Sequence, residues 1–101
     1  MTLLDEQQIT EGLERLDGWE WDRERAEIRR TVELPDFMGG VHLVTAVAYA
    51  AEEADHHPDI DIRYTKVTFH QTTHVAGGVT LADFELAARI DELIEAAIPG
   101  E

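Results

Sequence analysis

The stretch ADHHPDIDIRYTKVTFHQTTHVAGGVT, residues 54–80, decides the fold and holds four of the chain's five histidines. After Pro58, residues 59–64 and 66–74 alternate apolar with polar side chains and are rich in Ile, Val, Thr and aromatic residues. Alternation with a period of two is typical of strands that bury one face. We therefore expect two strands here, followed by a turn at residues 77–78.

The sequence before this stretch predicts a helix and two further strands. Apolar residues recur at roughly helical spacing from about Asp5 to Leu16, and Gly18 follows as a stop. Residues 19–34, WEWDRERAEIRRTVEL, alternate apolar and polar side chains on both sides of the charged centre at residues 22–25. This pattern predicts two strands joined by an exposed turn.

Two more helices flank the quoted stretch. A helix over residues 37–54 would be apolar on most of its circumference from Val41 to Ala51, and Pro35 fits its first turn. Thr80 begins a last helix that runs through Ile98, with Asp83 placed to complete a capping-box-like pair. Pro99-Gly100 would lie beyond its end.

The predicted order is therefore helix, strand, strand, helix, strand, strand, helix. Strands with one apolar face, and helices grouped to cover that face, imply an α+β two-layer domain. We expect a four-stranded, largely antiparallel sheet with three helices on one face. A chain of 101 residues fits one domain over residues 1–101.

The composition excludes several classes of function. With 22 acidic and 8 basic residues, the formal charge of −14 would repel nucleic acid and anionic membranes. The absence of Cys excludes a disulfide framework, a thiolate metal site and a cysteine nucleophile, and the absence of Ser excludes a Ser-His-Asp triad. The N-terminus lacks the features of a signal peptide, and no segment is apolar for long enough to span a bilayer. We expect a cytoplasmic location.

The histidines are placed for proton chemistry. His56 and His57 fall where the second helix ends, because Pro58 disfavours helical geometry in the residue before it. His74 is expected to close the fourth strand, with His70 on the same strand face, so one rim of the sheet would gather His56, His57 and His74. Histidine titrates near neutral pH and can both donate and accept protons in one catalytic cycle.

Two other interpretations of the histidines remain open at this point. They can be ordinary solvent-exposed loop residues. A metal site is the sharper alternative, because three His with Glu52, Asp55 or Asp83 could ligate Zn²⁺ or Fe²⁺. Adjacent histidines at a helix end terminated by proline tend to diverge, however, which disfavours convergence on one ion.

Three motifs in order over 33 residues then carry a resemblance to a known family. The chain resembles the pterin-4a-carbinolamine dehydratases in AEEADHHP (51–58), YTKV (64–67) and TTHVAGGVTLAD (72–83). The resemblance implies dehydration of 4a-hydroxytetrahydropterin, the carbinolamine left by aromatic amino acid hydroxylases, to quinonoid dihydropterin and water in tetrahydropterin recycling. It implies a hydro-lyase that needs no metal and no cofactor, because the pterin is the substrate.

The resemblance also assigns residues to roles. His56 and His74 resemble the acid/base pair, and His57 resembles the residue that positions the pterin. Glu52 and Asp83 match positions that support the site. The remaining substrate-binding positions implied by the family are Pro58, Thr73, Val75 and Ala76.

Departures from the family pattern are modest. Gln71 stands where an apolar strand residue is usual, Ile60 where an aromatic residue is common, and Val79 where Leu is more frequent. Because Ile60 is not aromatic, the sequence leaves open whether an aromatic ring flanks the pterin on that side.

The second helix predicts self-association. It is apolar on too many sides for a small two-layer domain, and its alanines would let another helix approach closely. We expect a homodimer or homotetramer, as the family resemblance also implies, and a functional link to an aromatic amino acid hydroxylase. The alternative function, also implied by the resemblance, is a non-catalytic dimerisation or assembly cofactor of another protein.

Overall fold

The order of helices and strands matches the predicted α-β-β-α-β-β-α pattern. A computed structural model of the chain describes residues 2–98. Its elements are α1 (Glu6–Leu13), β1 (Glu20–Asp22), β2 (Glu27–Glu33), α2 (Phe37–Ala54), β3 (Asp59–Arg63), β4 (Lys66–Gln71), the short 3-10 helix η1 (His74–Ala76) and α3 (Leu81–Ala97). The predicted α+β class is confirmed.

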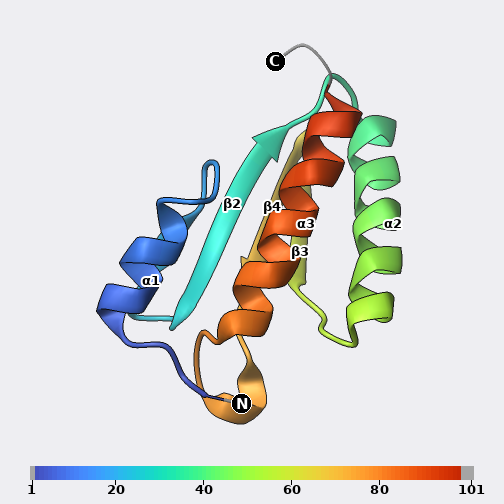
Figure 1. The fold of residues 1–101 in the computed structure, drawn as a ribbon. Coiled ribbons are helices and arrows are strands. Elements are labelled where there is room, and N and C mark those ends of the chain that lie inside the picture. Colours follow the sequence, from blue (N-terminus) through green and yellow to red (C-terminus); the bar gives the residue numbers. More distant parts are fainter. Residues whose placement is uncertain (1, 99–101) are drawn as a thin grey trace.

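The four strands form one open antiparallel sheet in the order β1-β2-β4-β3. The central strands β2 and β4 are in register with Ile28 opposite Gln71, and β3 pairs with β4 with Ile60 opposite Phe69. The helices α2 and α3 lie side by side across one face of the sheet, and α1 lies beside its β1 edge (Figure 1). The other face of the sheet is left uncovered by these helices.

The core fills the space between the sheet and the helices. Because successive strand side chains point to opposite faces, Ile28 and Val32 of β2 and Val67 and Phe69 of β4 all face the helices and are buried. The helices complete the core with Ile9, Leu43, Val47, Ala51, Leu86, Ala87, Ile90 and Ile94. The predicted apolar face is therefore confirmed for β4, but in β3 Ile60 is only half-buried and Ile62 is exposed.

Close packing of α1 against α3 depends on one glycine. A Cβ atom at Gly12 would lie only 2.5 Å from the ring of Phe84. Carbon atoms in contact normally sit about 3.5–4.0 Å apart, so no larger residue fits without moving the ring. Gly12 therefore allows α1 to approach the start of α3.

The last helix begins as the sequence predicts. Thr80 is the N-cap of α3, and Asp83 at the third helical position completes the capping box. The predicted residues beyond this helix, Pro99-Gly100, lie outside the described residues.

Three predicted boundaries are wrong by a few residues. The first helix ends at Leu13 rather than near Leu16. Pro35 lies before the N-cap of α2 rather than in its first turn, because the side chain of Asp36 accepts a hydrogen bond from the backbone N–H of Gly39 and the helix begins at Phe37. Tyr64 belongs to the turn after β3, where its positive φ of 53° removes it from the strand.

The end of the fourth strand also differs from the prediction. β4 ends at Gln71, and His74 lies in the short helix η1 instead of closing the strand. Thr73 forms an isolated bridge with Gly78, and Gly77 has a φ of 81°, so the chain turns back on itself here. His70 and His74 therefore do not share a strand face.

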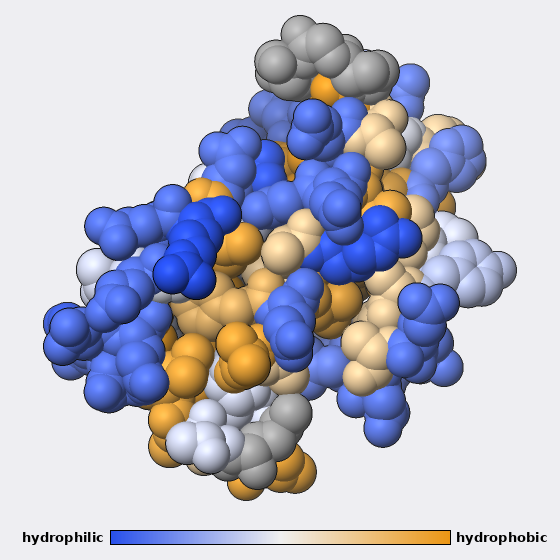
Figure 2. Space-filling model, viewed as in Figure 1, coloured by the Kyte–Doolittle hydropathy of each residue, from blue (hydrophilic) through white to orange (hydrophobic). Residues whose placement is uncertain are grey.

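The surface on the helix side is mostly hydrophilic, with apolar residues gathered between α1 and α3 and along α2 (Figure 2). Residues 37–51 contain no Asp, Glu, Lys or Arg. Within this segment Phe37, Met38 and Tyr49 expose 47%, 54% and 76% of their surfaces. Among residues 2–98, no helix is both long enough and apolar enough to cross a bilayer.

Candidate functional site

The three histidines of the predicted site lie at one end of the molecule. α2 ends at Ala54 because Asp55 adopts a left-handed conformation, with φ 51° and ψ 42°. His56 and His57 follow at once, and β3 begins immediately after Pro58. The short helix η1, which starts at His74, leads from β4 into α3 at this same end.

Asp83 connects the elements that meet here. Its carboxylate is fully buried, at 0% exposure, on the first turn of α3. Oδ1 lies 2.6 Å from Nε2 of His56, and Oδ2 accepts hydrogen bonds of 2.8 Å from the hydroxyl of Thr73 and the backbone N–H of Thr80. The hydroxyls of Thr73 and Thr80 are also 2.8 Å apart. One carboxylate thus fixes the loop after α2 and both sides of η1.

This contact determines which nitrogen of His56 carries a proton. An ionised carboxylate can only accept hydrogen bonds, so Nε2 of His56 must donate to Asp83. In the neutral imidazole the lone pair is then on Nδ1, where it can accept a proton. The arrangement is one in which a histidine held in a single orientation can act as an acid or a base.

The other two histidines each lie near a carboxylate on the surface. Nε2 of His57 is 2.5 Å from Oε2 of Glu52, which projects from the last turn of α2. Nε2 of His74 is 3.9 Å from Oδ2 of Asp59, the first residue of β3. Both pairs are exposed to solvent, which suits groups that meet a diffusing substrate.

Asp59 was not among the predicted site residues. The sequence signal was present, because Asp59 directly follows the His-His-Pro motif at the start of a strand. Its contact with His74 depends on the turn between β4 and η1, which sequence alone placed as part of the strand.

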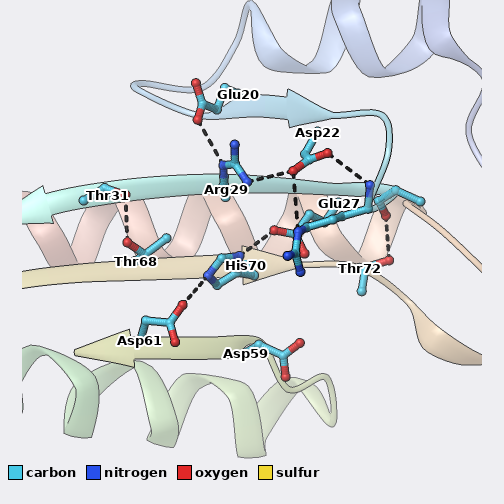
Figure 3. Close-up of polar contacts among 12 residues, drawn as sticks. Glu20, Asp22, Glu27, Arg29, Thr31, Asp59, Asp61, Thr68, His70 and Thr72 are labelled. Carbon is cyan, nitrogen blue, oxygen red and sulfur yellow. Dashed lines mark hydrogen bonds and ion pairs between the residues drawn. The ribbon is translucent and has the colours of Figure 1, made fainter. Parts of the chain in front are cut away.

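The remaining predicted residues surround this end of the molecule in different ways. Thr73 is buried and donates to Asp83, and Pro58 and Ala76 are half-buried. Val75 is 94% exposed on η1. His70 is on the uncovered face of the sheet, between Glu27 and Asp61 (Figure 3). His70 is therefore not part of the histidine site.

A groove borders the site. A hollow of about 220 Å³ between the end of α2 and the start of α3 is lined by Ala50, Glu53, Ala54, His56, Ala82, Glu85, Leu86 and Arg89. A larger hollow of about 700 Å³ lies along the C-terminal half of α3, beside Arg30 and Asp91, and no histidine lines it. By size alone the larger hollow would be the candidate substrate site. Ionisable side chains converge at the histidine end, however, and this favours the smaller hollow as the site.

The histidine cluster does not have the geometry of a metal centre. Within residues 2–98, no group of three or more His, Cys, Asp or Glu side chains is arranged to hold a metal ion. His56 and His57 instead turn to separate carboxylates, Asp83 and Glu52.

Comparison with known proteins identifies the family. The family model for pterin 4 alpha carbinolamine dehydratase matches residues 2–93. The chain belongs to the pterin-4-alpha-carbinolamine dehydratase family. Named relatives of this family include one from Roseiflexus castenholzii, 52% identical over 92 residues, with 91% of this chain and 97% of the relative covered. Another, from Mycolicibacterium smegmatis, is 45% identical over 94 residues, with 93% of this chain and 98% of the relative covered.

One solved structure agrees with this family assignment, and a second shows the same fold. The chain is similar to a transcriptional coactivator/pterin dehydratase from Brucella melitensis, with a TM-score of 0.87, 32% identity, and 91% of this chain and 98% of that chain covered. It also shares its fold with a pterin dehydratase-like protein identified as a RuBisCO assembly factor in the alpha-carboxysome. The TM-score is 0.65 and the identity 20%, with 76% of this chain and 89% of that chain covered. The predicted family is confirmed, and the family is named for a dehydratase, which is a hydro-lyase.

Proposed function

We propose that the chain dehydrates 4a-hydroxytetrahydropterin to quinonoid dihydropterin and water by histidine general acid/base catalysis. The reaction breaks the bond between C4a and the hydroxyl oxygen, which takes up a proton and leaves as water. N5 of the ring loses a proton, and a double bond forms between N5 and C4a. Two groups that exchange protons are therefore required, and each contributes about 10²–10⁴-fold to the rate.

The observation that carries the proposal is the fixed orientation of His56. Its Nε2–H donates to the buried Asp83, so its Nδ1 is available to one of the two proton transfers. His74, exposed on η1 with Asp59 3.9 Å away, serves the other transfer.

His57 holds the substrate. Its ring is oriented by Glu52 at 2.5 Å and lies next to Pro58 on the loop that separates α2 from β3. Thr73, Val75 and Ala76 border the pterin on the η1 side. The ring systems involved are neutral, so the protein's acidic surface does not repel them as it would a phosphate.

Two further parts of the proposal concern the setting of the reaction. The chain works as a homodimer or homotetramer, because residues 37–51 of α2, which expose Phe37, Met38 and Tyr49, contain no Asp, Glu, Lys or Arg in a protein of charge −14. It requires no metal and no further cofactor, and it acts in the cytoplasm on carbinolamine formed by an aromatic amino acid hydroxylase.

Stopped-flow absorbance with chemically generated 4a-hydroxytetrahydropterin tests the proposal. The purified chain should accelerate decay of the carbinolamine catalytically, and a chelator should leave the rate unchanged. A rate equal to that in buffer, measured on folded protein, would leave the second candidate, a non-catalytic assembly cofactor. That candidate is favoured only by similarity to the Brucella protein, whose description names a transcriptional coactivator as well as a dehydratase.

A further inference from the structure

β3 is a weakly anchored edge strand. In the described part of the chain it pairs with β4 alone, and four of its five residues are exposed. Its two apolar side chains give little burial, since Ile60 is only half-buried and Ile62 is exposed. Edge strands with so little buried apolar area open readily unless side chains hold them.

The start of β3 is part of the histidine site. Asp59 is its first residue and faces His74, and the two residues before it are His57 and Pro58. A shift of the beginning of β3 therefore moves the group proposed to bind the pterin. Small displacements of such groups have large effects on binding and catalysis.

One side chain on the uncovered face links three strands. The ring of His70, on β4, has Nδ1 2.5 Å from Oε2 of Glu27 on β2 and Nε2 2.8 Å from Oδ2 of Asp61 on β3 (Figure 3). The His70 side chain is only 18% exposed. It is also directly opposite Asp59 in the register of β3 and β4.

The geometry requires a charged ring. Both carboxylates can only accept, so both ring nitrogens must carry a proton, which makes His70 an imidazolium. Burial alone would lower the pKa of His70, but the hydrogen bonds and charges of Glu27 and Asp61 outweigh it and raise the pKa above its ordinary value of 6.5. Charge-assisted hydrogen bonds of this kind are among the stronger ones in proteins.

The basic side chain nearest to His70 in the sheet, Arg29, is already paired with other carboxylates. Arg29 is its register partner on β2, but the guanidinium donates to Glu20 at 3.0 Å and Asp22 at 2.7 Å on β1 (Figure 3). The charged groups that face His70 are thus Glu27 and Arg29 from β2, and Asp59 and Asp61 from β3. The acidic groups exceed the basic one, which favours the imidazolium.

We propose that His70 is a positioning residue, which holds β3 against β4 through Asp61 and thereby fixes the His57–Asp59 segment of the site. The proposal rests on the proposed function for its kinetic consequence, but the mechanical link is a property of the fold alone. Glu27 is on the central strand β2, so its contact with His70 stays in place when the edge strand opens. The contact of His70 with Asp61 is the one that breaks when β3 separates from β4.

The first experiment removes only the contact between His70 and Asp61 of β3. Asp61→Ala leaves the His70–Glu27 pair in place, and Arg63→Ala is the matched control, because it makes the same change on the same strand and face. At pH 6, hydrogen exchange at β3 amides should be about fivefold faster in Asp61→Ala and unchanged in Arg63→Ala. KM for the carbinolamine should rise about three- to tenfold in Asp61→Ala while kcat changes by less than about threefold, since His57 contributes uniform binding.

A second pair of variants tests the charge on residue 70. His70→Arg keeps a cation that can donate to two carboxylates, whereas His70→Gln is neutral. The His70→Arg variant should retain slow hydrogen exchange at the β3 amides and a low KM. The His70→Gln variant should show faster exchange and a higher KM. In wild type the protection of β3 should decline as pH rises through the titration of His70, and this decline should be absent in His70→Gln.

Equal β3 exchange in Asp61→Ala and Arg63→Ala, or equal behaviour of the arginine and glutamine variants, would overturn the proposal. The exchange measurements need no substrate. A wild-type chain without dehydratase activity would therefore refute the proposed function and leave the positioning role to be decided by exchange.

Discussion

Replacing Asp83 by Asn should weaken both the stability and the chemistry of the protein. The carboxylate is fully buried and accepts from His56, Thr73 and the backbone of Thr80. Asparagine has the same shape but only one acceptor oxygen, and its NH₂ group must face at least one of the three donors. Asp83→Asn therefore loses the charge-assisted hydrogen bonds, and its NH₂ group either leaves a buried donor without an acceptor or forces His56 into the tautomer that carries its proton on Nδ1.

The size of the effect follows from these contacts. A hydrogen bond to a charged group contributes about 1.5–3 kcal/mol, and a buried unsatisfied donor costs about 1–3 kcal/mol. Because asparagine keeps one acceptor, we expect a loss of about 2–3 kcal/mol in the free energy of unfolding. For a domain of this size, this lowers Tm by about 10–20 °C. Loss of the fixed orientation of His56 should lower kcat by about 10–100-fold.

Asp91→Asn is the matched control. Asp91 is on the same helix but at the far end from the histidines, where its carboxylate accepts from the indole N–H of Trp19 and the guanidinium of Arg30, each at 2.7 Å. Its substitution should destabilise the protein comparably and leave kcat within about threefold of wild type. Thermal unfolding followed by circular dichroism measures stability, and stopped-flow turnover well below both Tm values measures kcat. Equal kcat losses in the two variants would refute the argument, because activity would then follow stability rather than the orientation of His56.

Three further predictions concern stability. Gln71→Leu should raise the free energy of unfolding by about 1 kcal/mol in urea denaturation, because the amide of Gln71 is fully buried and neither of its polar atoms has a hydrogen-bond partner within residues 2–98; a loss of stability would contradict this. Gly12→Ala should destabilise the protein by about 1–3 kcal/mol, because the added Cβ atom would clash with the ring of Phe84. A lower Tm than that of wild type is the expected result. Because the folded pKa of His70 is raised above the unfolded value of 6.5, its contribution should be complete below pH 6.5 and be lost as pH rises through the folded pKa. Urea midpoints of wild type and His70→Gln should therefore converge at high pH.

The fold could be predicted from sequence because its elements carry strong local signals. Alternation in β2 and β4, the apolar circumference of α2 and the Thr80–Asp83 capping box all depend on side chains that are close in sequence. The failures occurred where a single backbone conformation ends an element. The left-handed conformation of Tyr64 and the 3-10 helix that starts at His74 depend on the backbone geometry of individual residues, so periodicity extended the third strand through Tyr64 and the fourth strand to His74.

The positions of His56 and His57 at the end of α2 could be predicted from sequence, but the contacts of the histidines could not. The motifs named His56, His57 and His74, and helix ends placed the first two correctly. That the capping residue Asp83 also contacts His56 could not be inferred from local pattern, because the contact joins residues 27 apart through the packing of α2 against α3. The link of His70 to Glu27 and Asp61 was missed for the same reason, since it depends on the register of three strands.

The central claim is that His56 and His74 transfer the protons of carbinolamine dehydration. The most direct measurement is the stopped-flow kcat of His56→Ala and His74→Ala beside wild type, with each variant shown to be folded by circular dichroism. We predict a loss of at least about 10²-fold in each single variant, and a double variant little worse than the poorer single one if both serve one rate-limiting relay. Retention of the full wild-type rate by either single variant would contradict the claim.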